Sequence, residues 1–276
     1  MSAETSGTID FVKQAMKRII PLATYRQPIT GLRRLRIRHW RPATDNDLIS
    51  TLIARLRRLR KKPVPANLLP AVVPVSKIWG LDRGTAIDRY YIEQFLSAHA
   101  SDIRGRTLEL GDRRYTRKFG DGVLHADVIH LESGNPEATI VGDLETGEGI
   151  PSDCYDCLIV INTFRLVYDV QSALANCYRA LRAGGVLLGH FTGITSACPD
   201  DPAWKGDFWR FTSASARSLC AEVFPIANVE VEAYGNVRTA TAYLYGLAAE
   251  ELSHEEMNYR DPNYELAILV RAVKPG

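Results

Sequence analysis

The segment Thr-Leu-Glu-Leu-Gly at 107–111 is the first of five short apolar runs that decide the fold class. Similar runs follow at 127–132, 138–143 and 155–161, and Leu-Arg-Ala-Gly-Gly-Val-Leu-Leu at 181–188 ends the series. Segments of helix length separate most of these runs, which predicts βαβ units and a parallel sheet. Ligands of such sheets bind outside the carboxyl ends of the strands, where several of these runs end in an acid or a glycine. The pattern therefore predicts a cofactor that contains a nucleoside.

The flanking sequence completes the predicted sheet. We expect a helix over 88–100 before the first strand, a sixth strand over 228–234 and a seventh over 264–273, at or near the sheet edge. We also expect a helix over 246–256 between the last two strands. The prediction is a doubly wound α/β sheet of seven strands, covered by helices on both faces.

The first 80 residues differ from the rest in charge. They contain 16 Lys and Arg against 4 Asp and Glu, whereas residues 81–276 contain 18 against 28. Apolar spacing predicts helices over 9–23 and 45–60, and four prolines make 63–76 an extended linker. We therefore divide the chain into a basic, mainly helical extension with a Pro-rich linker (1–80) and a compact domain (81–276). The basic segments can bind phosphate, an anionic membrane surface or an acidic partner, or can simply be solvated helix faces.

Composition and motifs exclude several classes of protein. No apolar run reaches the roughly 20 residues that cross a bilayer, and the first residues do not resemble a signal peptide. Five cysteines in a chain of this length suggest a reducing cytosol, so we expect a cytoplasmic protein, with peripheral membrane attachment as an option for the basic segments. The pair Cys154 and Cys157 lacks the partners of a metal site, and no metal is expected. Phosphate-binding-loop and Ser-centred nucleophile-elbow motifs are absent from the sequence.

The ordered runs together resemble the class I S-adenosylmethionine-dependent methyltransferases. The resemblance covers about residues 81–274 and is nearest to the group that contains many bacterial sugar and polyketide methyltransferases. It implies a Rossmann-like fold, S-adenosylmethionine as cofactor, and O-methylation of a sugar, glycan or other hydroxylated small molecule. Nucleic acid is not an expected partner, because the basic segments have few aromatic residues and the sequence contains no Asn/Asp-Pro-Pro-Tyr motif.

The resemblance also implies which residues bind the cofactor. The first motif would wrap its amino-acid end, the acid that ends the second run would bind the ribose hydroxyls, and the acid of the third run would lie beside the adenine amino group. A carboxylate suits the ribose because it accepts two hydrogen bonds at once. Leu144 would lie beside the adenine ring, and residues 162–164, which follow the fourth run, would line the site of methyl transfer. The implied cofactor residues are Glu109, Gly111, Asp112, Glu132, Gly142, Asp143, Leu144, Asn162 and Phe164.

Two departures from the family pattern leave an alternative open. The usual Gly-x-Gly-x-Gly turn is replaced by Gly-Asp-Arg-Arg-Tyr-Thr at 111–116, so Arg113 stands where a second glycine is expected. Arg113 can pair with the carboxylate of the cofactor, or it can block the pocket. Leu166 occupies a position where many members have a histidine. The alternative function is therefore a non-catalytic, methyltransferase-like binding protein. An NAD-dependent enzyme is a third reading, but the Gly-x-Gly-x-x-Gly turn it needs is missing.

Methyl transfer to a hydroxyl requires alignment of the acceptor and removal of its proton. His190, at the predicted carboxyl end of the fifth strand, is our candidate base, with a packing role as the alternative. In the family the loop after this strand builds the acceptor pocket, and here that loop leads to Asp-Phe-Trp-Arg-Phe-Thr at 207–212. Trp209 can stack on a sugar ring or can anchor the loop on the core. The candidate substrate-binding residues are Tyr91, Tyr115, Asp207, Trp209 and Arg210.

Overall fold

The computed structural model describes residues 71–198 and 206–276. The predictions for the basic extension up to residue 70, and for the loop part 199–205, lie outside the described residues. The α-helices and strands are α3 (Ile87–Ala98), β1 (Gly105–Leu110), α4 (Arg114–Phe119), β2 (Val123–His130), β3 (Ile140–Val141), β4 (Tyr155–Val160), α5 (Val170–Ala180), β5 (Leu181–Thr192), α6 (Ser213–Ala221), β6 (Val229–Tyr234), α7 (Val237–Leu244), α8 (His254–Asn258) and β7 (Ala267–Val273).

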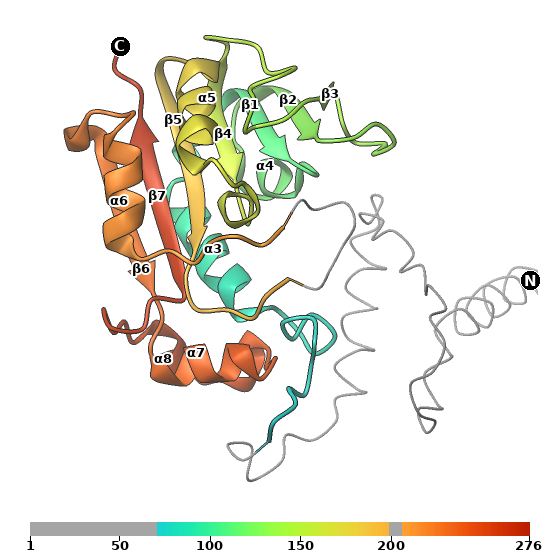
Figure 1. The fold of residues 1–276 in the computed structure, drawn as a ribbon, viewed down its shortest axis with the longest axis vertical. Helices are drawn as coiled ribbons and strands as arrows, with labels where there is room; N and C mark the ends of the chain where they lie inside the picture. Colours follow the sequence, from blue (N-terminus) through green and yellow to red (C-terminus); the bar gives the residue numbers. More distant parts are fainter. Residues whose placement is uncertain (1–70, 199–205) are drawn as a thin grey trace, which may run out of the picture. The chain divides into compact units, whose positions relative to one another are not determined.

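The seven strands form one sheet in the order β3-β2-β1-β4-β5-β7-β6 (Figure 1). The first five strands pair in parallel, and β7 runs antiparallel to both β5 and β6. This arrangement confirms the predicted seven-stranded, Rossmann-like sheet. The seventh strand lies one position in from the edge, and β6 forms the edge itself.

Helices cover both faces of the sheet, and the strand β4 shows how the sequence divides them. Its side chains alternate between the faces, as in any strand. Leu158 and Val160 join the core under α5 and α6, whereas Cys157 and Ile159 join the core under α3 and α7. All four side chains are buried, which explains why the strand reads as a continuous apolar run.

The region before β7 differs from the prediction of a helix over 246–256. A helix begins earlier, at α7, because Asn236 caps it in a reciprocal pair of hydrogen bonds with Thr239. Gly246 then has a φ of +74°, which interrupts any helix at that point. A short 3-10 turn (Ala249–Glu251) follows, and α8 begins after its own cap, Ser253.

The described part of the Pro-rich linker contacts the domain. The backbone N–H of Val75 donates to the carbonyl of Tyr245 at 2.9 Å. Trp79 packs against the core under α3 and α7, and both Trp79 and Gly80 have positive φ. The proposed boundary near residue 80 stays a prediction. Within the described ranges, no helix is long and apolar enough to cross a bilayer.

Candidate functional site

The carboxyl end of β1 holds the turn that the sequence assigns to the cofactor. Gly111 has a φ of +82°, and a β-carbon built on it would meet no atom within 4 Å, so the space beside this glycine is open. The helix α4 begins three residues later. The turn therefore combines left-handed backbone at one glycine with free space for a ligand.

Glu109 fixes the shape of this turn. Its side chain is buried, and its two carboxylate oxygens accept the backbone N–H groups of Tyr115 at 3.0 Å and Thr116 at 2.8 Å. These groups belong to the first turn of α4, where helical N–H groups need an acceptor. Burial raises the pKa of Glu109 to about 7, although these hydrogen bonds act in the opposite direction. Both oxygens of the Glu109 carboxylate are therefore occupied by backbone N–H groups of α4.

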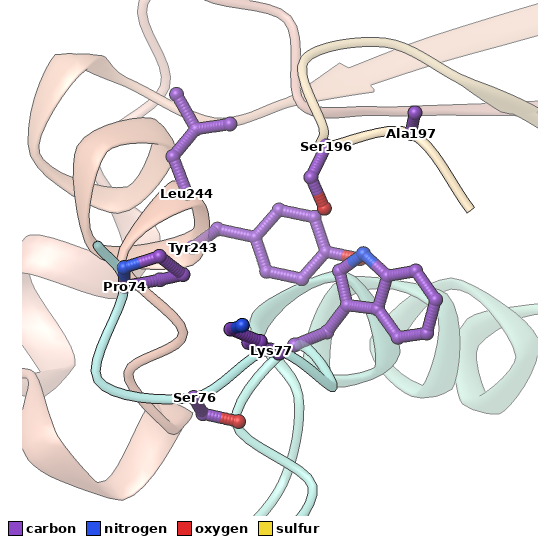
Figure 2. A pocket seen from close by; sticks show the side chains of 8 residues that line it. Pro74, Ser76, Lys77, Ser196, Ala197, Tyr243 and Leu244 are labelled. Atoms are coloured by element: carbon purple, nitrogen blue, oxygen red, sulfur yellow. The ribbon is translucent and has the colours of Figure 1, made fainter. Parts of the chain in front are cut away.

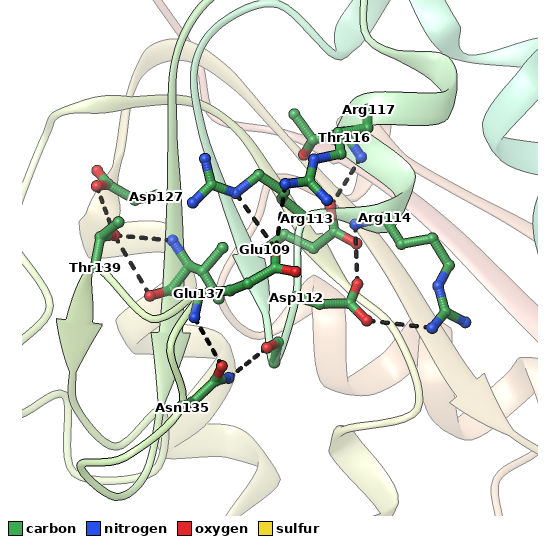
Figure 3. Close-up of polar contacts among 12 residues, drawn as sticks. Glu109, Asp112, Arg113, Arg114, Thr116, Arg117, Asp127, Asn135, Glu137 and Thr139 are labelled. Atoms are coloured by element: carbon green, nitrogen blue, oxygen red, sulfur yellow. Dashed lines mark hydrogen bonds and ion pairs between the residues drawn. The ribbon is translucent and has the colours of Figure 1, made fainter. Parts of the chain in front are cut away.

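A loop after β2 closes over the same turn (Figure 3). The Asn135 side chain donates to the carbonyl of Gly111 at 2.6 Å. The Glu137 carboxylate lies 3.6 Å from a guanidinium nitrogen of Arg113 and 3.6 Å from one of Arg117. Arg113 Nε and Glu137 Oε2 are both buried and form no hydrogen bond. Asp112, on the other side, accepts the backbone N–H of Arg114 at 2.9 Å.

The two acids that the sequence assigns to ribose and adenine follow β2 and β3. Glu132 is exposed, two residues beyond the strand end. Asp143 accepts the backbone N–H of Glu145 at 2.8 Å, which stabilises the turn after β3. Gly142 packs against the carbonyl of Glu148, 2.5 Å from where its β-carbon would be. Their roles toward a cofactor stay predictions.

The remaining implied cofactor residues divide between the surface and the core. Asn162 lies two residues beyond β4, is exposed and has a φ of +56°, a left-handed conformation that asparagine tolerates better than most residues. Leu144 and Phe164 are buried in the core, and the Phe164 ring stacks on Phe191 with centroids 4.6 Å apart. In this conformation the side chains of Leu144 and Phe164 lie in the core, and Asn162 is the residue of the three that solvent can reach.

The segment 207–212 contacts the 3-10 turn (Phe164–Leu166) that follows β4. The backbone N–H of Phe208 donates to the carbonyl of Arg165 at 2.8 Å. Asp207 forms two hydrogen bonds with Arg210, at 2.7 and 2.8 Å, and lies 3.1 Å from the Arg165 guanidinium. Burial alone would raise the pKa of Asp207, but these partners hold it below its usual value. The structure thus brings Asp207 and Arg210 together.

Trp209 belongs to an exposed aromatic cluster beside this ion pair. Its indole N–H donates to the carbonyls of Val167 and Tyr168 at 3.0 and 3.1 Å, and 40 % of the residue is exposed. The ring of Tyr168 lies 5.4 Å from that of Phe208 and 6.0 Å from that of Trp209. We call Tyr168, Phe208 and Trp209 the aromatic platform. The N–H contacts hold the Trp209 ring in place while leaving part of it accessible.

His190 does not reach the site. Its side chain is completely buried, and neither ring nitrogen has a hydrogen-bond partner. The prediction placed this residue at the strand end, but β5 continues to Thr192 and pairs there with β7, so His190 lies opposite Leu269 inside the sheet. Burial lowers the pKa of His190 to about 3. In this conformation it is a neutral core residue that an acceptor cannot touch.

Tyr91 and Tyr115 are also core residues rather than substrate contacts. Tyr91 is 1 % exposed, and its hydroxyl donates to the carbonyl of Met257 at 2.8 Å. Tyr115 is 8 % exposed and packs near Phe119. Both face the layer between the sheet and α3 because their helices are amphipathic.

The structure adds residues that the sequence did not indicate. Arg165 follows β4 and is 7 % exposed, and its guanidinium lies 6.0 Å from the ring of Trp79. Asp88, in the first turn of α3, is 9 % exposed and accepts the backbone N–H of Arg89 at 2.7 Å, and burial together with the nearby Asp88 raises the pKa of Tyr243 on α7. A charged residue inside an otherwise apolar segment was the available signal for Arg165. No such signal marked Asp88 and Tyr243.

The pair Cys154 and Cys157, noted in the sequence, lies in and just before β4. Cys157 is buried in β4, and burial raises its pKa. Cys154 and Cys157 are free thiols. No group of His, Cys, Asp and Glu in residues 71–198 and 206–276 has an arrangement that could hold a metal ion.

The residues at the strand ends fit S-adenosylmethionine in two respects. The space beside Gly111 is open, and Arg113, whose Nε lies 3.6 Å from the Glu137 carboxylate, brings a positive charge to the same turn. Exposed or half-exposed acids follow the neighbouring strands. Asn135 and Glu137, which contact this turn, both belong to the loop between β2 and β3.

Comparison with known proteins identifies the family. Residues 90–189 match the family described as methyltransferase domain. No curated protein matches the sequence significantly. The chain is similar to the structure of a SAM dependent methyltransferase from Archaeoglobus fulgidus, with 12 % identity, 70 % of this chain and 96 % of that chain covered, and a TM-score of 0.45. It is also similar to the structure of an S-adenosylmethionine dependent methyltransferase from Mesorhizobium loti, with 16 % identity, 68 % of this chain and 98 % of that chain covered, and a TM-score of 0.45. The family match and the strand order identify the chain as a class I S-adenosylmethionine-dependent methyltransferase.

Proposed function

We propose that this protein methylates a hydroxyl group of a sugar, a glycan or another hydroxylated small molecule. The observation that supports this acceptor class is the aromatic platform. Aromatic rings that are partly exposed and held by hydrogen bonds suit stacking on the flat face of a sugar ring. Arg210 and Asp207 lie next to Trp209 and offer charged and polar groups to ring hydroxyls.

The chemistry requires little from the protein. When bound, S-adenosylmethionine supplies an electrophilic methyl group on a positively charged sulfur. The chain must hold the acceptor hydroxyl in line with that methyl group and take up the proton of the hydroxyl. Arg165 supports this geometry, because its carbonyl and guanidinium both hold the segment that begins at Asp207. No covalent intermediate on the protein is needed.

One observation favours a second function, a methyltransferase-like protein that binds without catalysis. Asn135 and Glu137 close over the first turn, and the two arginines Arg113 and Arg117 face Glu137. If this closure persists, Arg113 and Arg117 stay paired with Glu137 and not with the carboxylate of the cofactor. A partner would then be bound through other surfaces of the chain.

Titration calorimetry with S-adenosylmethionine and S-adenosylhomocysteine separates the two functions. Micromolar binding supports the enzyme, and the absence of heat supports the binding protein. Incubation with methyl-labelled S-adenosylmethionine and a pool of hydroxylated metabolites should then give products 14 daltons heavier, seen by mass spectrometry.

The acceptor class is tested by Trp209→Ala, with Tyr259→Ala as a control in another exposed aromatic residue. We expect Trp209→Ala to raise the KM for the acceptor about fivefold, because stacking on an aromatic ring contributes roughly 1 kcal/mol. Tyr259→Ala should leave it unchanged. Equal KM values in all three proteins would contradict the role of the aromatic platform.

A further inference from the structure

Arg165 is a buried charged residue in the 3-10 turn (Phe164–Leu166) that follows β4, and it is 7 % exposed. It comes directly after residues 162–164, which the family resemblance assigns to the site of methyl transfer. A buried guanidinium costs free energy unless it is paired and hydrogen-bonded. The contacts that offset this cost lead to the aromatic platform and to the linker.

Both the backbone and the side chain of Arg165 hold the aromatic platform. The carbonyl of Arg165 accepts the backbone N–H groups of Phe208 at 2.8 Å and of Trp209 at 3.3 Å. The guanidinium lies 3.1 Å from the carboxylate of Asp207, the residue that precedes them in the chain. The indole N–H of Trp209 donates to the carbonyl of Val167, two residues after Arg165. The platform is therefore anchored to the turn that follows β4.

The Asp207 carboxylate joins Arg165 to both sides of the loop after β5. It accepts the backbone N–H of Cys198 at 2.7 Å and a hydrogen bond from Arg210 at 2.7 Å. Arg210 also donates to the carbonyl of Ser196 at 3.1 Å. We call Arg165, Asp207 and Arg210 the arginine–aspartate cluster. Within this cluster, the Arg165 side chain is the member that belongs to the turn after β4.

Arg165 also contacts the linker, at the wall of a cavity of about 210 Å³ (Figure 2). Its guanidinium lies 6.0 Å from the ring of Trp79, at the outer limit of a cation–π contact. Trp79 lines the cavity together with Ser196 and Tyr243, and Figure 2 shows the Tyr243 ring extending between Ser196 and the linker. The linker and the loop after β5 therefore both contact the arginine–aspartate cluster, through Trp79 and Ser196.

We propose that Arg165 is a positioning residue, which fixes the aromatic platform, and with it a stacked acceptor, relative to residues 162–164. The proposal rests on the proposed function, in which the acceptor stacks on the platform. Methyl transfer needs a narrow range of geometry, and a displacement of about 1 Å can lower a rate roughly 100-fold. Arg165 acts on the acceptor through the position of the Trp209 ring. The ion pair with Asp207 is the part of this anchor that a side-chain substitution removes.

The test compares Arg165→Met with Arg271→Met as a matched control. Methionine keeps much of the apolar stem of arginine and removes its charge. Arg271 forms an ion pair with Asp102 at 2.7 Å, and Asp102 precedes the amino end of β1, opposite to the strand ends of the candidate site. All proteins are compared at a temperature at which circular dichroism shows them to be folded.

Three quantities are measured on the full chain. The first is the KM for a hydroxylated metabolite that the wild-type protein methylates, determined with and without the additional substitution Trp209→Ala. The second is the affinity for S-adenosylhomocysteine. The third is the rate of backbone amide hydrogen exchange in the peptide that contains Phe208 and Trp209, whose N–H groups donate to Arg165.

We expect Arg165→Met to raise the KM for the acceptor about fivefold, as Trp209→Ala does, because a displaced ring loses its stacking. Affinity for S-adenosylhomocysteine should stay within about twofold. In the Trp209→Ala background Arg165→Met should change the KM by less than about twofold, since two residues that act through one contact are not additive. The peptide should exchange about tenfold faster in Arg165→Met. Arg271→Met should leave all three quantities unchanged.

An equal rise in KM with and without Trp209, which a merely structural role would give, would overturn the inference and leave the proposed function intact. Wild-type values of KM and of amide exchange in Arg165→Met would do the same. If Arg165→Met fails to fold, Arg165→Gln decides by the same measurements, because it removes the charge and keeps a polar end toward Asp207. A wild-type protein that binds S-adenosylhomocysteine but methylates no hydroxylated compound would instead refute the proposed function, and the inference with it.

Discussion

Replacement of His190 by leucine tests whether this residue is a base or a part of the core. In the structure the imidazole is completely buried, and burial lowers its pKa from 6.5 to about 3. The folded protein therefore keeps His190 neutral, whereas the unfolded chain takes up a proton below pH 6.5. Stability contributed by the neutral form is present above pH 6.5 and is lost as the pH falls, by about 1.4 kcal/mol per unit.

The magnitude at an accessible pH follows from this slope. Between pH 6.5 and pH 5 the wild-type protein should lose about 2 kcal/mol through His190, and His190→Leu should not. At pH 7.5 the variant should be as stable as the wild type or more stable by about 1 kcal/mol, because it removes two buried nitrogens that have no hydrogen-bond partner. Leucine is close to histidine in volume, so the change leaves little cavity.

The assay is urea unfolding of both proteins at pH 5.0 and pH 7.5, with the difference between them as the measured quantity. The difference removes the contributions of other titrating groups that the two proteins share. Methyl transfer and affinity for S-adenosylhomocysteine should be unchanged in the variant. An identical pH slope in the two proteins, or loss of methyl transfer at full stability, would refute the reasoning and return His190 to the role of base.

Three further predictions concern the strand ends. Because burial raises the pKa of Glu109 to about 7, the protonated side chain contributes to the free energy of unfolding below pH 4.5, and this contribution is lost as the pH rises through about 7. Glu109→Gln should remove this loss of about 3 kcal/mol, measured by urea unfolding. Arg165→Ala leaves Asp207 with Arg210 as its remaining cation and should cost about 2 kcal/mol in thermal unfolding, while an unchanged melting temperature would contradict a structural role for this pair. Glu132→Ala and Asp143→Ala should each weaken binding of S-adenosylhomocysteine about tenfold in calorimetry, through loss of a charge-assisted hydrogen bond, and full affinity in both would show that the pocket lies elsewhere.

The order of strands could be predicted because the buried parallel strands are short apolar runs with clear ends. Tyr155–Val160 is an example, since all its inward positions on both faces are apolar. The helix α7 was missed because its sequence, Val-Arg-Thr-Ala-Thr-Ala-Tyr-Leu, is rich in β-branched residues and has no clear apolar stripe. Its N-cap Asn236 and the positive φ of Gly246 decide its ends, and these are local signals that periodicity does not contain.

The site was harder to predict than the fold, for a geometric reason. The side chain of a strand residue changes face or depth with a shift of one or two positions, and β5 extends further than its apolar run indicates. His190 therefore lies in the core, although its place in the sequence was consistent with a strand end. Asp207, Trp209 and Arg210 lie together because they are neighbours in one loop, and their role toward a substrate stays a prediction. Asp88, Arg165 and Tyr243 come from three distant segments, and only the folded chain brings them together.

The unusual first turn is explained by its backbone. Arg113 stands where the family expects a second glycine, but its φ of −106° is open to any residue. Among residues 111 to 113 the left-handed conformation occurs at Gly111, where a glycine is present. Because α4 begins at Arg114, the turn is short and needs no further glycine for its path.

The loop between β2 and β3 gives Arg113 its surroundings. It brings Asn135 and Glu137 to the turn, so that the Arg113 guanidinium lies 3.6 Å from a carboxylate. The arginine that stands in place of the glycine is therefore held by this loop. A turn that keeps a left-handed glycine, open space beside it and a guanidinium nearby offers room and a positive charge to the amino-acid end of S-adenosylmethionine, which favours a working cofactor site over a degenerate one.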